Sequence, residues 1–199
     1  ISRLLSLLIL ISSIAAASAT YYFSYRDDEE QAATLSAQLT SRLDDQLTVL
    51  EGVRALYFTH KVEGGDHIRA YLRAIHTHAR STGIQGIGIV AATTPAQESD
   101  RLALIRKNYG PDARLWPKSS GKLTYPITFI EPYDTLNSGA LGFDMYSETI
   151  RRRAIQRAWT TGQASASNIV QLIQNGVADD PQPAFLLFLP ITDPQNPQS

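Results

Sequence analysis

The sequence predicts an α+β domain that carries a long helix at its N-terminal end. Apolar residues from Leu35 to Val53 recur at steps of three or four, the spacing of one helix face. Two runs rich in β-branched residues, Ile84 to Val90 and Pro126 to Glu131, predict strands. The last two predicted strands, Ser167 to Gln174 and Ala184 to Leu189, can form a hairpin across a turn. We therefore expect an antiparallel sheet with helices on one face.

The composition limits the possible function classes. A chain of 199 residues that is 43% hydrophobic and 19% charged can bury a core, as one domain or two small ones. Its formal net charge of -1 argues against a nucleic-acid-binding surface. The sequence contains no cysteine, which excludes disulfide frameworks, thiolate metal sites and thiol nucleophiles. The first residue is Ile, so we expect further sequence upstream of it.

Residues 1–24 are predicted to form a transmembrane helix. The run from Leu4 to Phe23 has no charge, and at about 1.5 Å per residue it crosses a bilayer core of about 30 Å. Arg3 precedes this run, and aromatic residues between 21 and 25 follow it as an interfacial belt. A cleaved signal peptide with its cleavage site near Ala17 to Ala19 is the alternative. Both interpretations place the remainder outside the cytoplasm, and the first one predicts an inner- or plasma-membrane protein with a periplasmic domain.

Residues 25–62 are predicted to extend this helix as a stalk. The stretch from Gln31 to His60 contains no proline, and a helix from Leu4 to about Thr59 would be roughly 80 Å long. One small domain cannot cover a helix of that length. We expect the upper part of the apolar stripe to pack on the domain and the lower part to face a second subunit in a parallel homodimer. The leucines of the stripe are Leu35, Leu39, Leu43, Leu47 and Leu50.

Residues 63–199 are predicted to form the folded domain. Gly64-Gly65 ends the stalk, and Asp66 is placed to cap the next helix. Pro95 opens a third helix, and Gly162 ends a fourth from the position after its C-cap. The predicted helices are His67 to Ser81, Ala96 to Tyr109 and Thr149 to Thr161, and Gly110 to Lys122 is predicted to be a loop.

No catalytic or metal site is predicted. His76 and His78 point about 200° apart on a helix and cannot share a metal ion. No serine stands in a Gly-x-Ser-x-Gly context, and side chains of adjacent carboxylates such as Asp44 and Asp45 diverge. We therefore expect no enzyme activity, no cofactor and no metal, which favours a binding module. An exported enzyme with its signal peptide and an adhesion or protein-binding ectodomain are the alternatives.

One carboxylate, Asp144, stands among apolar neighbours in the stretch Leu141 to Met145. Burying a carboxylate costs free energy unless a hydrogen bond or a cation satisfies it. Asp144 could cap the helix that begins near Thr149, for which Ser147 is an equally good candidate. It could also bind a ligand, and both alternatives remain open at this point.

Several stretches together indicate a known family. They are Gly83 to Gly88, Tyr125 to Pro132, Leu141 to Met145, Thr161 to Ala164 and Phe185 to Pro190. In these stretches the sequence resembles the CHASE domain, the extracellular sensory domain of membrane histidine kinases and nucleotide cyclases. The likeness extends from about Leu35 to Ile191.

The resemblance implies PAS-like sensory subdomains beyond the stalk helix, in a two-component or diguanylate or adenylate cyclase receptor. The last strand and the second membrane helix of the family are not in this sequence, so we expect the C-terminal part of the domain to be missing. In the plant members, which are cytokinin receptors, the residue that matches Asp144 holds the adenine ring of the hormone. Ala166 stands where the hormone receptors have a bulkier apolar residue.

The predicted ligand pocket lies over the sheet, with Asp144 at its edge. Ile127 and Phe129 should share one strand face, because side chains alternate along a strand. An ionised carboxylate only accepts hydrogen bonds, so the ligand should offer an N–H pair or a cation, as an adenine-type ring or an amine does. The expected partners are this ligand, a membrane and a second subunit, without nucleic acid. The predicted ligand-binding residues are Asp144, Phe129, Phe143, Met145, Ile127 and Ala166.

Overall fold

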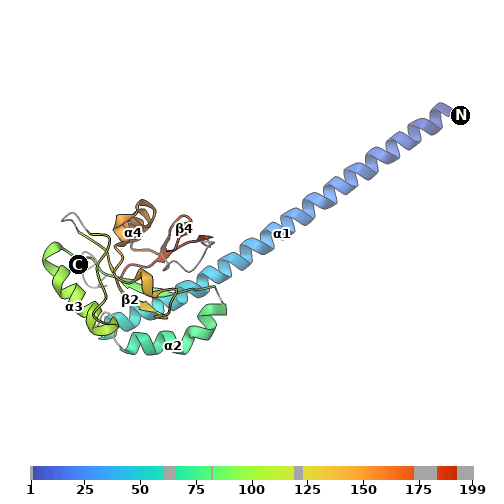
Figure 1. Ribbon diagram of the computed structural model, residues 1–199. Helices are drawn as coiled ribbons and strands as arrows, with labels where there is room; N and C mark the ends of the chain where they lie inside the picture. The colour runs from blue at the N-terminus through green and yellow to red at the C-terminus, as the bar shows by residue number, and fades with distance from the viewer. Residues whose placement is uncertain (1, 61–65, 82, 119–122, 173–182, 192–199) are drawn as a thin grey trace. The chain divides into compact units, whose positions relative to one another are not determined.

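The computed structural model describes residues 2–60, 66–81, 83–118, 123–172 and 183–191 (Figure 1). The chain divides into two units, Ile1–Asp45 and Gln46–Ser199, and each is described by itself. The predicted end of the stalk at Gly64-Gly65 and most of the turn between the last two predicted strands lie outside the described residues.

The first unit consists of the long helix predicted from the sequence. α1 (Ser2–His60) is a single helix of 59 residues, and its last part, from Gln46, belongs to the second unit. In the first unit the side chains of Leu35 and Leu39 are 61% and 62% exposed. Within the part of the chain that the structure describes, no helix combines the length and the apolar character that a membrane span requires.

The second unit is built on the end of α1. Its first core cluster joins Val49 and Val53 of α1 to Ile68 and Leu72 of α2 (Asp66–Ser81). Figure 1 shows α2 beside the last turns of α1. A Cβ at Gly52 would overlap the hydroxyl of Tyr71, so the missing side chain lets the two helices approach closely. The apolar stripe of the predicted stalk therefore becomes core of the domain at its upper end.

β1 (Ile87–Val90) and β2 (Ile127–Glu131) pair antiparallel and complete this core. β1 begins at Ile87 and not at the predicted Ile84. The ladder has a bulge in which Thr128 is an extra residue, since Ile89 lies opposite Phe129 but Val90 lies opposite Ile127. The prediction that Ile127 and Phe129 share a face is therefore wrong. Phe129 belongs to the first core cluster and Ile127 to a second one.

The second core cluster lies between β2, α3 and the loop after β2. A short turn, η1 (Pro95–Gln97), leads into α3 (Glu98–Tyr109), close to the predicted bounds. Ile105 of α3 is fully buried, and it packs with Ile127 and Ile130 of β2. Leu141, Phe143 and Met145, from the loop that contains the 3₁₀ turns η2 (Ser138–Ala140) and η3 (Met145–Ser147), complete the cluster.

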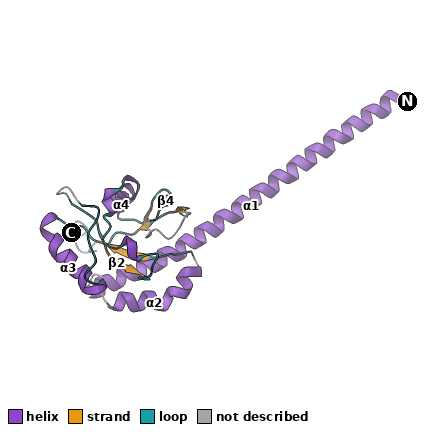
Figure 2. Ribbon diagram, in the orientation of Figure 1, coloured by secondary structure: helices purple, strands orange, loops and turns teal. Residues whose placement is uncertain are grey.

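α4 (Thr149–Thr161) has the predicted bounds, and Gly162 follows it in the left-handed conformation with φ 67°. The segments of the last two predicted strands pair antiparallel in two short ladders (Figure 2), but the first ladder uses Ser165 and Ala166, which precede the predicted start at Ser167. β3 (Ser165–Ala166) pairs with β6 (Leu187–Phe188), and β4 (Val170–Gln171) pairs with β5 (Pro183–Ala184).

The prediction of one continuous sheet is wrong, because the described strands form three separate two-stranded sheets. Ser167 lies where the hairpin is interrupted. Its hydroxyl donates to the carbonyl of Asn168 at 2.7 Å and accepts the N–H of Leu186 at 2.9 Å. A side chain that bonds to the backbone in this way competes with the regular ladder.

Candidate ligand cavity

A cavity of about 440 Å³ lies in the second unit. It is lined by Gln46 and Leu50 of α1, the segment from Gly83 to Gly88, two residues of β2, and the segments that surround η2 and β6. Its volume is within the range of roughly 300–1,000 Å³ that is typical of small-molecule sites. Most of the lining is aliphatic or aromatic.

Three of the predicted ligand-binding residues meet at this cavity. Ile127, Phe143 and Met145 line it, and each is buried. The ring of Phe143 meets the edge of Trp116 with centroids 4.8 Å apart, and the guanidinium of Arg151 lies 5.4 Å from the centroid of the Phe143 ring. Phe143 is therefore fixed from two sides and forms a rigid part of the wall.

Two buried polar side chains, Asn137 and Arg151, also line the cavity, and the sequence analysis did not select them. Asn137 Nδ2 donates to the carbonyls of Gln85 and Pro132, at 3.2 and 3.1 Å. These bonds tie the loop after β2 to the segment before β1. The amide of Asn137 thus holds two walls of the cavity together.

Arg151 is 5% exposed and belongs to the buried face of α4. It pairs with Glu148, and its Nη2 donates to the carbonyl of Gln171 at 2.7 Å. A sequence signal for its burial exists, because Arg151, Ala154 and Ala158 recur at helical spacing and the two alanines face the core.

Asp144 does not line the cavity. Its Oδ1 accepts the N–H groups of Tyr125 and Tyr146, at 2.8 and 3.0 Å. It therefore caps η3 and not α4, whose N-cap residue is Glu148. The alternative in which Asp144 or Ser147 caps α4 is therefore wrong, and the Ser147 hydroxyl donates to the carbonyl of Asp144 instead, at 2.6 Å.

The stretch from Leu141 to Met145 forms backbone hydrogen bonds both with β2 and with the loop that precedes β2. The N–H of Gly142 donates to the carbonyl of Ile127 at 2.9 Å, and its carbonyl accepts the N–H of Trp116 at 3.0 Å. Gly142 has φ 74°, and a Cβ there would overlap the carbonyl oxygen of Arg114. Only glycine fits this position, because both the conformation and the space exclude a side chain.

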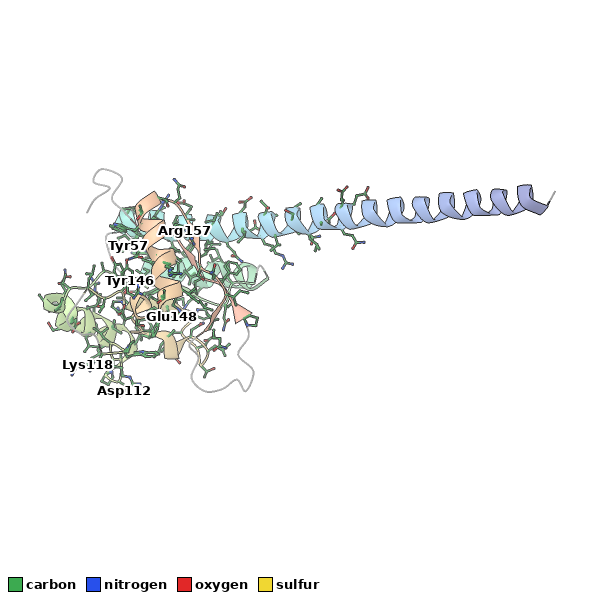
Figure 3. The ribbon with its side chains drawn as sticks, turned by 90° about the horizontal axis from the view of Figure 1, so that it is seen from above. Tyr57, Asp112, Lys118, Tyr146, Glu148 and Arg157 are labelled. Carbon is green, nitrogen blue, oxygen red and sulfur yellow. The ribbon has the colours of Figure 1, made fainter. Side chains whose placement is uncertain are left out.

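Tyr125 and Tyr146 stack beside the carboxylate of Asp144, with ring centroids 3.9 Å apart and an interplanar angle of 18°. Burial of the phenol, and next its hydrogen bond with Tyr125, raise the pKa of Tyr146 to about 12. Figure 3 labels Tyr146 and Glu148 where α4 begins and Arg157 farther along the helix. The stack therefore closes the turn that leads into α4.

The other predicted site residues lie elsewhere. Phe129 is 1% exposed in the first core cluster, and Ala166 is exposed on β3, where its carbonyl accepts Nη2 of Arg157 at 2.6 Å. Neither residue lines the cavity. Of the stalk leucines, Leu43 and Leu47 are partly buried, and Leu50 lines the cavity.

A second cavity, of about 380 Å³, lies between α2 and the end of β2, and it shares the segment from Ile84 to Ile87 with the first. No cluster of three or more potential metal-ligating side chains occurs among the described residues.

A comparison with protein families matches most of the second unit. The model of the family described as CHASE domain matches residues 65–199. This match includes every residue that lines the first cavity except Gln46 and Leu50 of α1. No curated protein matches the chain.

Proposed function

Since the chain belongs to the CHASE domain family, whose members are sensory rather than catalytic domains of receptors, we propose that it is the extracytoplasmic ligand-sensing domain of a membrane receptor. The output domain of such a receptor is a histidine kinase or a diguanylate or adenylate cyclase. A small ligand binds in the first cavity, and α1 carries the signal towards the membrane.

The observation that carries this proposal is the contribution of α1 to the cavity wall. Gln46 and Leu50 line the cavity, and the neighbouring Val49 and Val53 are buried in the core. Because the ligand touches α1, the affinity of the protein for the ligand changes when this helix changes its position. Such a difference in affinity is what shifts a conformational equilibrium.

The anchor of the receptor is proposed from the sequence. The charge-free run from Leu4 to Phe23 forms the membrane helix of residues 1–24, and residues 25–62 form the stalk. The described strands and helices of residues 63–199 are then part of PAS-like sensory subdomains. Two exposed leucines, Leu35 and Leu39, support a homodimer through the stalk, because a second copy would bury them.

The lining of the cavity indicates the kind of ligand. Its walls are mainly apolar, and Asn137 and Arg151 are the buried polar side chains among the lining residues that the structure describes. The expectation of an adenine-type or amine ligand depended on Asp144 facing it, and the Asp144 carboxylate instead accepts the backbone N–H groups of Tyr125 and Tyr146. Both side-chain N–H groups of Asn137 already donate to carbonyls, so we expect a compact, mainly apolar ligand with a hydrogen-bond acceptor that faces Arg151.

Blocking the cavity tests the proposal. Ala184 of β5 lines the cavity and is partly buried, so Ala184→Trp should fill the space without disturbing the core. Ala166 of β3 is exposed and lies outside the cavity, which makes Ala166→Trp a matched control. A thermal-shift screen of small, mainly apolar compounds, followed by calorimetry, should find ligands of the wild type and of the control that Ala184→Trp no longer binds.

Two results would contradict the proposal. The first is a set of ligands that bind the blocked variant as tightly as the wild type, which would place binding outside this cavity. The second is no ligand at all but saturable binding of a protein partner, which would support the adhesion alternative.

A further inference from the structure

The second cavity has a charged wall and an apolar wall. Arg69 and Arg73 of α2 line it together with Glu131, which ends β2, and Leu72 and Ile75 provide apolar surface. Arg69 and Arg73 are four residues apart, so they lie on the same side of α2. Among the residues that the structure describes, none of α1 lines this cavity, which separates it from the proposed signalling contact.

Glu131, which is buried, and Arg69, which is partly buried, form an ion pair that is not saturated. Nε of Arg69 lies 3.2 Å from Oε1 of Glu131, and Glu131 is 7% exposed. The contact is close, but it is not aligned as a hydrogen bond, and neither atom has another hydrogen-bond partner in the described part of the chain. Buried charged groups normally form such bonds, so this pair retains capacity for a polar group of a ligand.

The position of Arg69 is fixed by its surroundings. Its guanidinium lies 5.4 Å from the centroid of the Tyr109 ring and 5.6 Å from that of the Phe129 ring. These contacts and the Glu131 carboxylate hold the guanidinium at the cavity wall without mobility of the long side chain. A donor that is already ordered loses less conformational entropy when it binds a ligand.

The charge of this wall is positive. Glu131 compensates one of the two arginines, and Arg73 is exposed with no ion-pair partner among the residues that the structure describes. One negative charge therefore neutralises the site. A zwitterion would leave the excess positive charge in place.

We propose that the second cavity binds a small monocarboxylate with an apolar body, such as an arylalkanoate. The carboxylate accepts hydrogen bonds from Arg69 and Arg73, which are charge-assisted and therefore strong. The apolar body packs on Leu72 and Ile75. Glu131 does not contact the carboxylate but keeps Arg69 in place.

The test uses 3-phenylpropanoate as the probe and calorimetry on the chain described here. Its amide, which has the same shape without the charge, is the matched probe, and L-phenylalanine tests the zwitterion. The acid should bind at least about tenfold more tightly than the amide, the difference expected for hydrogen bonds to a charged group. Its affinity should also fall with added salt.

Variants locate the binding. Arg73→Gln should weaken binding of the acid about tenfold, and Arg153→Gln, an exposed arginine of α4 that lines neither cavity, should leave it unchanged. Arg73 is exposed, so the variant will fold. Ala184→Trp, which blocks the first cavity, should also leave binding of the acid unchanged.

Four results would overturn the inference: no saturable binding of the acid at millimolar concentration, equal binding of acid and amide, tighter binding of phenylalanine than of the acid, or loss of the acid in Ala184→Trp. The first three do not bear on the ligand of the first cavity, so this inference can fail through them while the proposed function stands. Loss of the acid in Ala184→Trp would instead place the acid in the first cavity.

Discussion

Two residues of one short loop, Gly142 and Asp144, fix the position of the side chains that form the cavity wall. Gly142 allows the chain to pass against Arg114, and Asp144 collects two backbone N–H groups on one oxygen. Phe143 stands between them and faces the cavity. The carboxylate therefore stabilises the loop, and in the proposed function its neighbour Phe143 faces the ligand.

Asp144→Ala should destabilise the ligand-free protein. It removes two hydrogen bonds to a charged acceptor, so we expect a loss of about 1.5–3 kcal/mol in the free energy of unfolding. The melting temperature should fall by several degrees in calorimetry without ligand. Asp112→Ala, in an exposed loop, is the control and should change little. An unchanged melting temperature together with lost ligand binding would instead show that Asp144 contacts the ligand directly.

Gly142→Ala should cost more stability than Gly162→Ala. Both glycines have positive φ, 74° and 67°, so both variants carry the backbone cost of about 1–2 kcal/mol. Only at Gly142 does the added Cβ also overlap a carbonyl oxygen, whereas nothing lies within 4 Å of a Cβ at Gly162. Urea unfolding measures the difference. Equal losses would mean that the approach to Arg114 does not constrain this loop.

Stability should decrease at alkaline pH, partly through Tyr146. Burial and the bond to Tyr125 raise the pKa of Tyr146 from 10.0 to about 12, and burial also raises the pKa of Tyr109. In this window the folded state keeps a proton that the unfolded state releases, so the free energy of unfolding falls as the pH rises. The contribution is complete below pH 10.0 and is lost as the pH passes about 12.

Tyr146→Phe should therefore show a shallower decline than the wild type in urea unfolding at a series of pH values. The remaining slope contains the contribution of Tyr109. A variant with the same slope as the wild type would show that Tyr146 titrates with its ordinary pKa.

At the scale of elements, α1 has two different surroundings along its length. Leu39 is 62% exposed, whereas Val53 is 4% exposed in the first core cluster. The same helix thus exposes Leu39 to solvent in the first unit and buries Val53 in the core of the second. This difference follows from packing, because the apolar stripe itself continues across both.

Val53→Ala should lower the free energy of unfolding of the domain by about 2 kcal/mol, from lost transfer energy and the cavity left behind. Leu39→Ala removes a larger but exposed side chain of the same helix, and it should lie within about 0.5 kcal/mol of the wild type. Chemical unfolding followed by the tryptophan signal provides both values. Similar losses would show that Val53 does not contribute to the core as described.

The elements with strong local signals could be predicted from the sequence. Gly162 and the apolar spacing gave the bounds of α4, and the absence of proline gave the continuity of α1. The features that depend on pairing between distant parts of the chain could not be predicted from the sequence. The bulge at Thr128 and the interruption at Ser167 are products of strand registry and side-chain competition, which no local pattern encodes.

The candidate site was predictable to the same extent. Ile127, Phe143 and Met145 stand on segments whose apolar pattern is readable, and they do line the cavity. Asn137 was missed because its burial depends on Gln85, a partner that is distant in sequence. Arg151 was missed although its spacing with Ala154 and Ala158 places it on the buried face of α4. Phe129 was misplaced by the bulge next to it.

At the scale of the whole molecule, the proposed receptor is a parallel homodimer joined by its stalks. Leu39→Glu combined with Leu43→Glu places charges in the stripe of the first unit, and it should convert a dimer in detergent into a monomer. Light scattering measures the mass. Gln38→Glu and Arg42→Glu, at neighbouring exposed positions off the stripe, are controls that should keep the dimer. A mass that stays the same in all variants would contradict the dimer.

The central claim is that a ligand in the first cavity acts on α1, and hydrogen exchange of the chain with and without a ligand from the screen tests it most directly. We expect slower amide exchange in residues 46–60 of α1, in 84–90 and in 183–188, all lost in Ala184→Trp and kept in Ala166→Trp. Saturating ligand that protects the cavity loops but leaves exchange in residues 46–60 unchanged would contradict it.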